Sequence, residues 1–164
     1  MRFVVVSVLL LVASCISVAA QDAIYLIRHG EKELHGAEPA LTPEGRQRAA
    51  DWAEMLRHVG IDAIITSDAL RTRETGRIIA DALGLKHNAL PKADISALVD
   101  TLEFDYEKET VLVVAHAETI PRILESLGVK EDIAIDQNEF ANLFVLVAPS
   151  SNDPVYLHLL MPGR

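Results

Sequence analysis

The chain has 164 residues, enough for one domain of ordinary size. Half of the residues are hydrophobic, a quarter are charged and the formal net charge is −9, so the chain is a poor non-specific ligand for nucleic acid or anionic membranes. A single cysteine excludes an internal disulfide framework and a zinc site built on cysteines. The composition is that of a globular domain that does not bind nucleic acid.

The first twenty residues predict a targeting segment. Arg2 precedes an apolar run, Phe3–Ala13, and small side chains lead up to Ala20. This order is typical of a signal peptide, here residues 1–20, that is cleaved before Gln21. We therefore expect the protein to be exported and to be periplasmic or secreted.

Two alternatives to cleavage remain open. An uncleaved membrane anchor needs about 20 apolar residues, more than this run provides. The residues Val12-Ala13-Ser14-Cys15 also resemble a bacterial lipobox, which would tether the chain to a membrane through a lipid on Cys15. In either case residues 21–164 form a domain outside the cytosol.

The first predicted strand, Ala23–Ile27, is short, apolar and partly β-branched. It leads directly into Arg28-His29-Gly30-Glu31 and then into a polar loop, residues 32–41. Thr42-Pro43-Glu44 predicts an N-cap with proline at the first helical position. Apolar residues with helical spacing continue this helix to about Arg57.

A second strand is predicted over Ile61–Thr66, and Ser67 is placed to cap a helix over Asp68–Leu83. Residues 85–110 are harder to interpret. They are expected to hold one short helix around Ile95–Leu102 and to be too few for a large lid.

The third strand, Val111–Ala115, is the most apolar after the N-terminal segment, and it ends at His116. A helix follows over Thr119–Leu127, then two late strands, Leu143–Ala148 and Val155–Leu160. Strands that alternate with helices predict an α/β fold, a three-layer α/β/α sandwich with a mostly parallel central sheet.

Two predicted strands end in histidine, since Arg28-His29 follows the first strand and His116 follows the third. In open α/β sheets the ligand crevice lies outside the carboxyl ends of the strands, so both histidines should reach one crevice. Arg71 is about one turn into the helix after the second strand and should reach the same edge. Two arginines and two histidines there predict a pocket for a dianion such as phosphate.

Four ordered blocks carry a resemblance to a known family: Tyr25-Leu26-Ile27-Arg28-His29-Gly30-Glu31, Leu41-Thr42-Pro43-Glu44-Gly45-Arg46-Gln47-Arg48-Ala49, Thr66-Ser67-Asp68-Ala69-Leu70-Arg71-Thr72-Arg73-Glu74-Thr75-Gly76 and Val113-Val114-Ala115-His116-Ala117-Glu118-Thr119. The chain resembles the histidine phosphatase superfamily, also called phosphoglycerate mutase-like, as a short, single-domain, exported member of bacterial type. The resemblance implies that His29 is the nucleophile that takes the phosphoryl group. It also implies that Arg28, Arg71 and His116 hold the phosphate oxygens.

The chemistry of these residues agrees with that assignment. Neutral imidazole is a good nucleophile near pH 7, and covalent catalysis divides hydrolysis into phosphorylation of His29 and attack by water. Because the arginines and His116 supply positive charge, we expect no metal ion and no cofactor.

The general acid is not decided by the sequence. Glu118 stands where family members often carry asparagine, and Glu31 lies beside the nucleophile. Mutase-type members place their acid between the Arg71 block and the second histidine, where this chain offers Asp94, Asp100 and Glu103 and no motif chooses among them. Glu118, Glu31 and Asp100 are the possible general acids.

The sequence thus predicts an exported phosphoric monoester hydrolase that cleaves phosphomonoesters or phosphoramidates through a phosphohistidine intermediate. Its expected partners are phosphorylated small molecules, glycans or proteins, with membrane contact only if Cys15 is lipidated. A phosphoglycerate mutase-like phosphotransferase and a non-catalytic phosphate-binding module are the alternatives. His58, His87 and His158 are expected to be ordinary surface or edge residues, and Arg73 to face away from Arg71.

Overall fold

The computed structural model describes residues 23–92, 94–147 and 154–162. Its elements, in chain order, are β1 (Ala23–Arg28), α1 (Pro43–Leu56), β2 (Ala63–Ser67), α2 (Leu70–Leu83), β3 (His87–Leu90), α3 (Ile95–Asp100), the π-helical turn η1 (Thr101–Asp105), β4 (Val111–Ala115), α4 (Ile120–Ser126), β5 (Asn142–Val147) and β6 (Val155–Leu160). The predicted signal peptide, its cleavage before Gln21 and the lipidation of Cys15 concern residues outside the described ranges.

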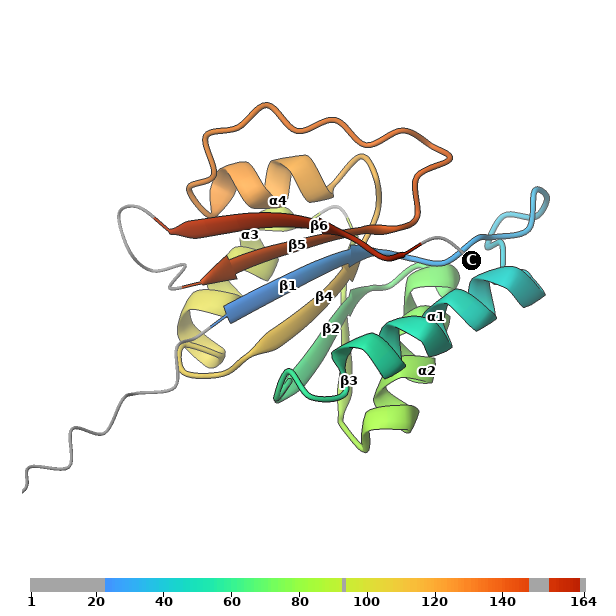
Figure 1. The fold of residues 1–164 in the computed structure, drawn as a ribbon. Helices are drawn as coiled ribbons and strands as arrows, with labels where there is room; N and C mark the ends of the chain where they lie inside the picture. The colour runs from blue at the N-terminus through green and yellow to red at the C-terminus, as the bar shows by residue number, and fades with distance from the viewer. Residues whose placement is uncertain (1–22, 93, 148–153, 163–164) are drawn as a thin grey trace, which may run out of the picture.

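The strands form one sheet in the order β3-β2-β4-β1-β5-β6. The first four of these are mutually parallel, whereas β5 and β6 run antiparallel to their neighbours. Helices α1 and α2 cover one face of the sheet, and α3 and α4 cover the other (Figure 1). The predicted three-layer α/β/α sandwich with a mostly parallel sheet is confirmed.

Strand β4 shows why its sequence is continuously apolar. Val111, Val113 and Ala115 pack with α3 and α4, while Leu112 and Val114 pack with α1 and α2. All five side chains are buried, because a parallel strand covered on both faces has no solvent side. The strand matches its predicted bounds and delivers His116 to the edge of the sheet.

The start of α1 also follows the prediction, and it supports the turn after β1. Thr42 caps the helix, its hydroxyl accepting from the backbone N–H of Gly45 at 3.1 Å. A Cβ on Gly30 would lie 2.5 Å from the carbonyl oxygen of Gly45, and a Cβ on Gly45 would clash with the backbone of Glu31. The helix therefore packs directly on the His29–Glu31 turn.

We predict that Gly45→Ala lowers the free energy of unfolding by about 1–3 kcal/mol, since backbone must move to admit the methyl group. Urea denaturation measures the change. Gln47→Ala, at an exposed position two residues later on the same helix, is the control and should change stability by less than about 0.5 kcal/mol. Equal stability of Gly45→Ala and wild type would contradict the close packing.

The bounds of β2 and α2 differ from the prediction, and Ser67 is not the helix cap. Helix α2 begins at Leu70 with Ala69 as its N-cap residue and no side-chain cap. The hydroxyl of Ser67 instead bonds to Thr72 and His116. The short β strand predicted over Ile61–Thr66 is shifted to Ala63–Ser67.

The segment 85–110 holds more structure than expected. The sequence analysis missed β3, a short edge strand that pairs only with β2 among the described strands. The predicted helix is present as α3, which Asp94 caps by accepting from Ala97 N at 2.8 Å. It continues into η1 rather than ending at Leu102.

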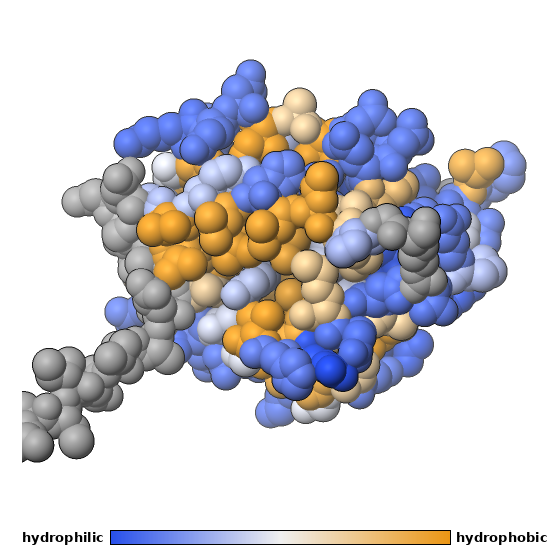
Figure 2. Space-filling model, in the orientation of Figure 1, coloured by the Kyte–Doolittle hydropathy of each residue, from blue (hydrophilic) through white to orange (hydrophobic). Residues whose placement is uncertain are grey.

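Strand β5 begins one residue before its predicted start, and the predicted last residue, Ala148, is outside the described residues. Strand β6 has its predicted bounds. Figure 2 shows apolar side chains gathered over β6, where the exposed large hydrophobic residues are Val155, Leu157, Leu159 and Leu160. No helix among the described residues is long and apolar enough to cross a membrane.

Candidate active site

The two predicted histidines meet at the carboxyl ends of adjacent parallel strands. Arg28 pairs with Ala115 in the β1–β4 register, and the backbone N–H of His29 donates to the carbonyl of Ala115 at 3.1 Å. The rings of His29 and His116 lie 5.2 Å apart between centroids and meet edge to face. Both residues are buried, and their imidazoles lie next to each other at this edge of the sheet.

Arg71 joins the two imidazoles. It is the second residue of α2, and its Nε donates to His29 Nε2 at 3.1 Å while Nη2 donates to His116 Nδ1 at 3.1 Å. Arg73 is exposed, in keeping with its predicted direction away from the site. The structure thus brings Arg71, His29 and His116 into one hydrogen-bonded cluster.

The hydrogen bonds of His29 define which nitrogen is nucleophilic. Its Nδ1 lies 2.7 Å from the carbonyl oxygen of Gly30, which can only accept, so Nδ1 carries the proton. The lone pair of Nε2 then faces Arg71. Burial and the charges of Arg71 and Arg28 outweigh the Gly30 bond and lower the pKa of His29 to about 4. At neutral pH the ring is therefore uncharged and able to attack phosphorus through Nε2.

A chain of hydroxyl groups fixes His116 in the opposite tautomer. Since Arg71 donates to Nδ1, the proton is on Nε2, which donates to Ser67 Oγ at 2.8 Å. Ser67 Oγ lies 2.7 Å from Thr72 Oγ1, and Thr72 donates to the carbonyl of Ala69 at 2.7 Å. Burial, followed by the charges of nearby basic groups, lowers the pKa of His116 to about 3.

Arg28 reaches the site but is held by the long connection between α4 and β5. Its Nη1 donates to the backbone carbonyls of Asp136, Gln137 and Glu139 at 3.1, 2.8 and 3.0 Å. Its Nε is buried without a hydrogen-bond partner among the described residues. Such an unpaired buried donor is costly unless a ligand accepts from it.

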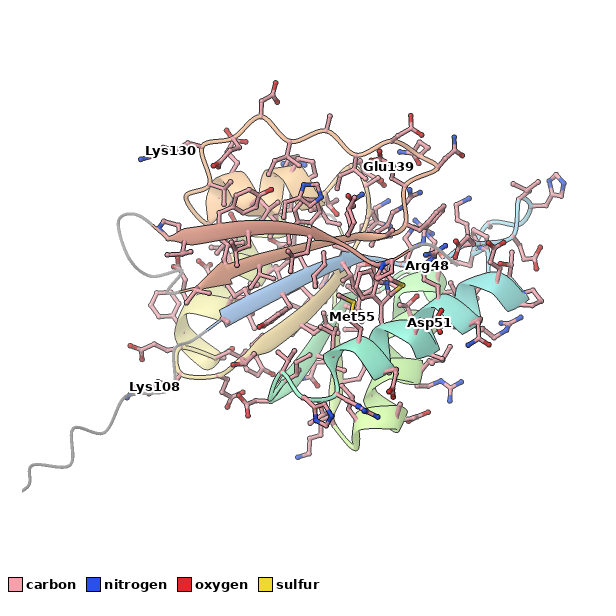
Figure 3. The ribbon with its side chains drawn as sticks, in the orientation of Figure 1. Arg48, Asp51, Met55, Lys108, Lys130 and Glu139 are labelled. Carbon is pink, nitrogen blue, oxygen red and sulfur yellow. The ribbon has the colours of Figure 1, made fainter. Side chains whose placement is uncertain are left out.

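Phe140 on the same connection completes this side of the site. The guanidinium carbon of Arg28 lies 4.0 Å from the centre of the Phe140 ring, and that ring meets His29 edge to face with centroids 6.2 Å apart. Figure 3 shows Glu139 on the connection and Arg48 on α1 at the same end of the sheet. The α4–β5 connection therefore folds back onto His29.

The candidate general acids differ in their surroundings. Glu31 receives both Nε and Nη2 of Arg48, with Nε–oxygen distances of 2.7 and 2.9 Å. Glu118 forms an ion pair with Lys92 at 2.7 Å. Partial burial acts to raise the pKa of Glu118, but the bond and charge of Lys92 outweigh it and lower that pKa to about 2.

Glu118 is therefore ionised at neutral pH and is not prepared to donate a proton. Asp100 is exposed at the end of α3, whereas α3 and its cap contribute Asp94, Ile95 and Leu98 to the small hollow beside His116. Neither Glu31 nor Glu118 is a free acid, and the geometry favours none of the three candidates.

Comparisons with known proteins find a family model and solved structures that are similar to this chain. Residues 24–94 match the family model of the histidine phosphatase superfamily (branch 1). The match contains Arg28, His29 and Arg71 and covers less than half of the chain. A protein named probable phosphoglycerate mutase GpmB from Enterobacter sp. (strain 638) is 44% identical over 68 residues, which cover 37% of this chain and 32% of that protein. The chain thus spans about a third of the length of the curated relatives it matches.

Solved structures share the fold over most of the chain. The protein histidine phosphatase SixA complexed with tungstate has a TM-score of 0.71 at 19% identity, covering 84% of this chain and 96% of that one. The mycobacterial glucosyl-3-phosphoglycerate phosphatase has a TM-score of 0.65 at 14% identity, covering 86% and 98%. At these identities the likeness shows the fold alone, the α/β architecture that this chain shares with them.

Several residues of this candidate site were not found from the sequence. Ser67 and Thr72 orient His116, and Thr75 accepts from the backbone N–H of Gly30 at 3.1 Å. These three hydroxyl groups flank Arg71 in the sequence, which is a signal that could have revealed them. Phe140 and Lys92 carried no such signal.

The other histidines have separate contacts. His58 is exposed, His87 bonds to Thr66 at 2.9 Å, and His158 stacks on Phe144 with centroids 4.5 Å apart. The prediction that these three are surface or edge residues agrees with their positions.

We predict that this protein loses stability on mild acidification. The pKa values of His29 and His116 are lower in the folded protein than the unfolded value of about 6.5, so the unfolded chain binds more protons below that pH. The stabilisation that comes from the two neutral histidines is complete above pH 6.5. The free energy of unfolding should then fall by about 2 kcal/mol per histidine between pH 6.5 and 5.

Urea denaturation at both pH values measures this effect. His29→Gln should reduce the pH dependence, while His58→Gln, at an exposed position, should retain it. A free energy of unfolding that is equal at pH 7 and pH 5 would contradict the burial of two neutral imidazoles.

Proposed function

We propose that the protein is a phosphatase that hydrolyses phosphomonoesters or phosphoramidates through phosphorylation of His29. The observation that carries the proposal is the neutral His29, whose Nε2 lone pair faces the guanidinium group of Arg71. The nucleophile and a fork of donors for phosphate oxygens therefore lie side by side.

The remaining groups also suit a phosphoryl dianion. Arg28, Arg71 and Lys92 bring positive charge to the site of a chain whose formal net charge is −9. The buried, unpaired Nε of Arg28 would gain an acceptor from a bound oxyanion. A bound dianion would also favour protonation of His116, which could then donate to a phosphate oxygen.

The proposed cycle has two steps. The lone pair of His29 Nε2 attacks phosphorus, the bond to the leaving oxygen or nitrogen breaks, and that group departs with the bonding pair. Water then attacks the phosphohistidine, releasing inorganic phosphate and restoring His29. The first test is hydrolysis of 4-nitrophenyl phosphate by the wild type, since absence of turnover would favour the non-catalytic phosphate-binding module.

We predict that the rate depends steeply on the leaving group. Because Glu31 and Glu118 are in ion pairs, proton donation to the departing atom, typically worth 10²–10⁴-fold, is weak. Aryl phosphates and phosphohistidine should react faster than alkyl phosphates.

A plot of log kcat/KM against leaving-group pKa for substituted aryl and alkyl phosphates should have a negative slope. A flat plot, with good activity on glycerol phosphate, would show that an acid operates. Glu118→Gln, Glu31→Gln and Asp100→Asn would then identify it.

The relatives support two related activities. SixA is named a protein histidine phosphatase, which favours a phosphoramidate on a protein as substrate. GpmB is named a probable phosphoglycerate mutase, which supports the phosphotransferase alternative. If the protein converts one phosphoglycerate isomer into another phosphorylated product and releases no free phosphate, that alternative would be established.

The proposed enzyme acts outside the cytosol on a phosphorylated small molecule, glycan or protein. The support is the order of residues before Gln21, which is typical of a cleaved signal peptide. N-terminal sequencing of exported protein should begin at Gln21, and a lipid-modified Cys15 would instead show a membrane-tethered protein.

A further inference from the structure

A tight turn on the connection between α4 and β5 encloses one end of the Arg28 side chain. The backbone carbonyls of Asp136, Gln137 and Glu139 accept from Nη1 of Arg28 at 3.1, 2.8 and 3.0 Å. A terminal guanidinium nitrogen carries only two hydrogens, so three acceptors use its capacity fully. This arginine-binding turn, residues 136–139, therefore takes one nitrogen of a buried guanidinium group at the end of β1.

Glu139 holds the arginine-binding turn closed. Its backbone N–H donates to the carbonyl of Asp136 at 3.0 Å, and its carboxylate oxygen Oε2 accepts from the backbone N–H of Asp136 at 3.0 Å. The carboxylate of Asp136 accepts from the backbone N–H of Asn138 at 2.8 Å. Glu139 Oε2 also lies 3.5 Å from Nδ2 of the buried Asn142, the first residue of β5. The turn is thus bonded to itself and to the sheet.

Phe140 covers the face of the same guanidinium group. The guanidinium carbon of Arg28 lies 4.0 Å from the centre of the Phe140 ring, a distance at which the cation is attracted to the ring face. The ring also meets His29 edge to face, with centroids 6.2 Å apart. Phe140 therefore sets the plane of the guanidinium group beside His29, while the turn fixes one end of it.

These contacts decide which edge of the guanidinium group is left for a ligand. An oxyanion can bind two N–H groups of an arginine at once. Because the turn occupies Nη1, the edge that remains is formed by Nε and Nη2. Nε is buried and has no partner among the described residues. The contact of Nη2 with Gln137 Oε1 is long, at 3.4 Å, so a charged phosphate oxygen would be the better acceptor.

We propose that Glu139 and Phe140 are positioning residues that act through Arg28, directing its Nε–Nη2 edge at the phosphoryl group of the substrate. The proposal rests on the proposed function and adds two residues whose effect on phosphate passes through Arg28. A free arginine side chain loses rotamer freedom when it binds a ligand. In this protein the turn and the ring order the side chain during folding, so that phosphate meets a prepared edge.

The first test compares variants of Glu139 by their affinity for inorganic phosphate, measured by calorimetry on the whole protein. Glu139→Ala removes the acceptor that closes the turn and should weaken phosphate binding about three- to tenfold. Glu139→Gln keeps an oxygen at this position and should bind phosphate at least as tightly as wild type. Glu125→Ala removes an exposed carboxylate from α4; as the matched control, it should keep the wild-type affinity.

The sign of the change separates positioning from simple charge. Removal of a carboxylate near an anion site strengthens anion binding by Coulomb's law, so a charge effect alone would make both Glu139 variants bind phosphate more tightly. Positioning predicts weaker binding by alanine only. Phosphate affinity in Glu139→Ala that equals or exceeds the wild-type value would overturn the role of Glu139.

Phe140→Leu keeps an apolar side chain and removes the aromatic face. It should weaken phosphate binding about two- to tenfold, and Phe140→Tyr, which restores the face, should recover most of the loss. Wild-type affinity in Phe140→Leu would overturn the role of Phe140. An equal loss in Phe140→Tyr would do the same, because the ring face would then not be what matters.

A double-mutant cycle tests whether the two residues act through Arg28. Arg28→Lys keeps the positive charge but lacks the planar fork that the turn and the ring hold. In this background Glu139→Ala and Phe140→Leu should each change the phosphate affinity by less than about twofold. Losses that persist at full size would show that both residues act by loosening the fold elsewhere and would overturn the proposal.

Failure of the proposed function gives a different result. A protein that binds phosphate with these variant effects but does not hydrolyse 4-nitrophenyl phosphate would retain the positioning of Arg28 without catalysis. A protein that hydrolyses the ester while Glu139→Ala and Phe140→Leu keep the wild-type phosphate affinity would retain catalysis and overturn the positioning roles.

Discussion

His29→Gln should reduce hydrolysis of 4-nitrophenyl phosphate by at least about a thousandfold, because it removes the nucleophile rather than a group that assists it. Glutamine keeps much of the volume of histidine at a buried position, so the fold should persist. Steady-state rates of the purified variant measure the loss. His58→Gln changes an exposed histidine and should retain wild-type activity.

The same prediction has a direct chemical readout. Wild-type protein that is mixed with substrate and quenched without acid should carry a phosphoryl group on His29, and this adduct should be labile in acid and stable in base. The adduct should be absent from His29→Gln. A phosphoryl group on His116 would show that the roles of the two imidazoles are reversed, and no adduct under burst conditions would exclude the covalent route.

The positions of His29 and His116 were predictable because they depend on local patterns. Each follows a short apolar run, and a buried parallel strand requires such a run on both of its faces. The carboxyl ends of parallel strands meet at one edge, so two strand-terminal histidines could be placed together without knowing the intervening structure. The helix cap at Thr42 was predictable for the same reason, since Thr-Pro-Glu acts within one turn.

The rest of the site depends on contacts between distant parts of the chain. Arg28 and Glu139 are separated by 111 positions, and no periodicity in the α4–β5 connection indicates that it returns to β1. The ion pairs of Glu31 and Glu118 join residues 17 and 26 positions apart, so the sequence could not show that these carboxylates are already paired. Strand β3 lacks an apolar pattern because it lies at the edge of the sheet and is largely exposed.

Arg71→Ala should cost far more activity than Arg73→Ala, because Arg71 alone of the two joins His29 and His116. In the empty site its donors meet two imidazole nitrogens, and the charged oxygens of a phosphoryl group are stronger acceptors for the same fork. Substrate should therefore draw the guanidinium onto phosphate and release the lone pair of His29. Losing one or two charge-assisted hydrogen bonds, worth about 1.5–3 kcal/mol each, lowers kcat/KM roughly tenfold to several-hundredfold.

The titration of the two histidines separates this role from a structural one. The charge of Arg71 contributes to the lowered pKa of both His29 and His116, so Arg71→Ala should raise both pKa values toward 6.5 in NMR titrations. Arg73→Ala, which removes an equal charge from an exposed position two residues away, should leave kcat/KM within about twofold of wild type. Comparable losses in both variants would show that the phosphate pocket has been placed wrongly. A large loss in Arg71→Ala without a rise in either histidine pKa would contradict the cluster, since a guanidinium 3.1 Å from each ring must oppose protonation of both.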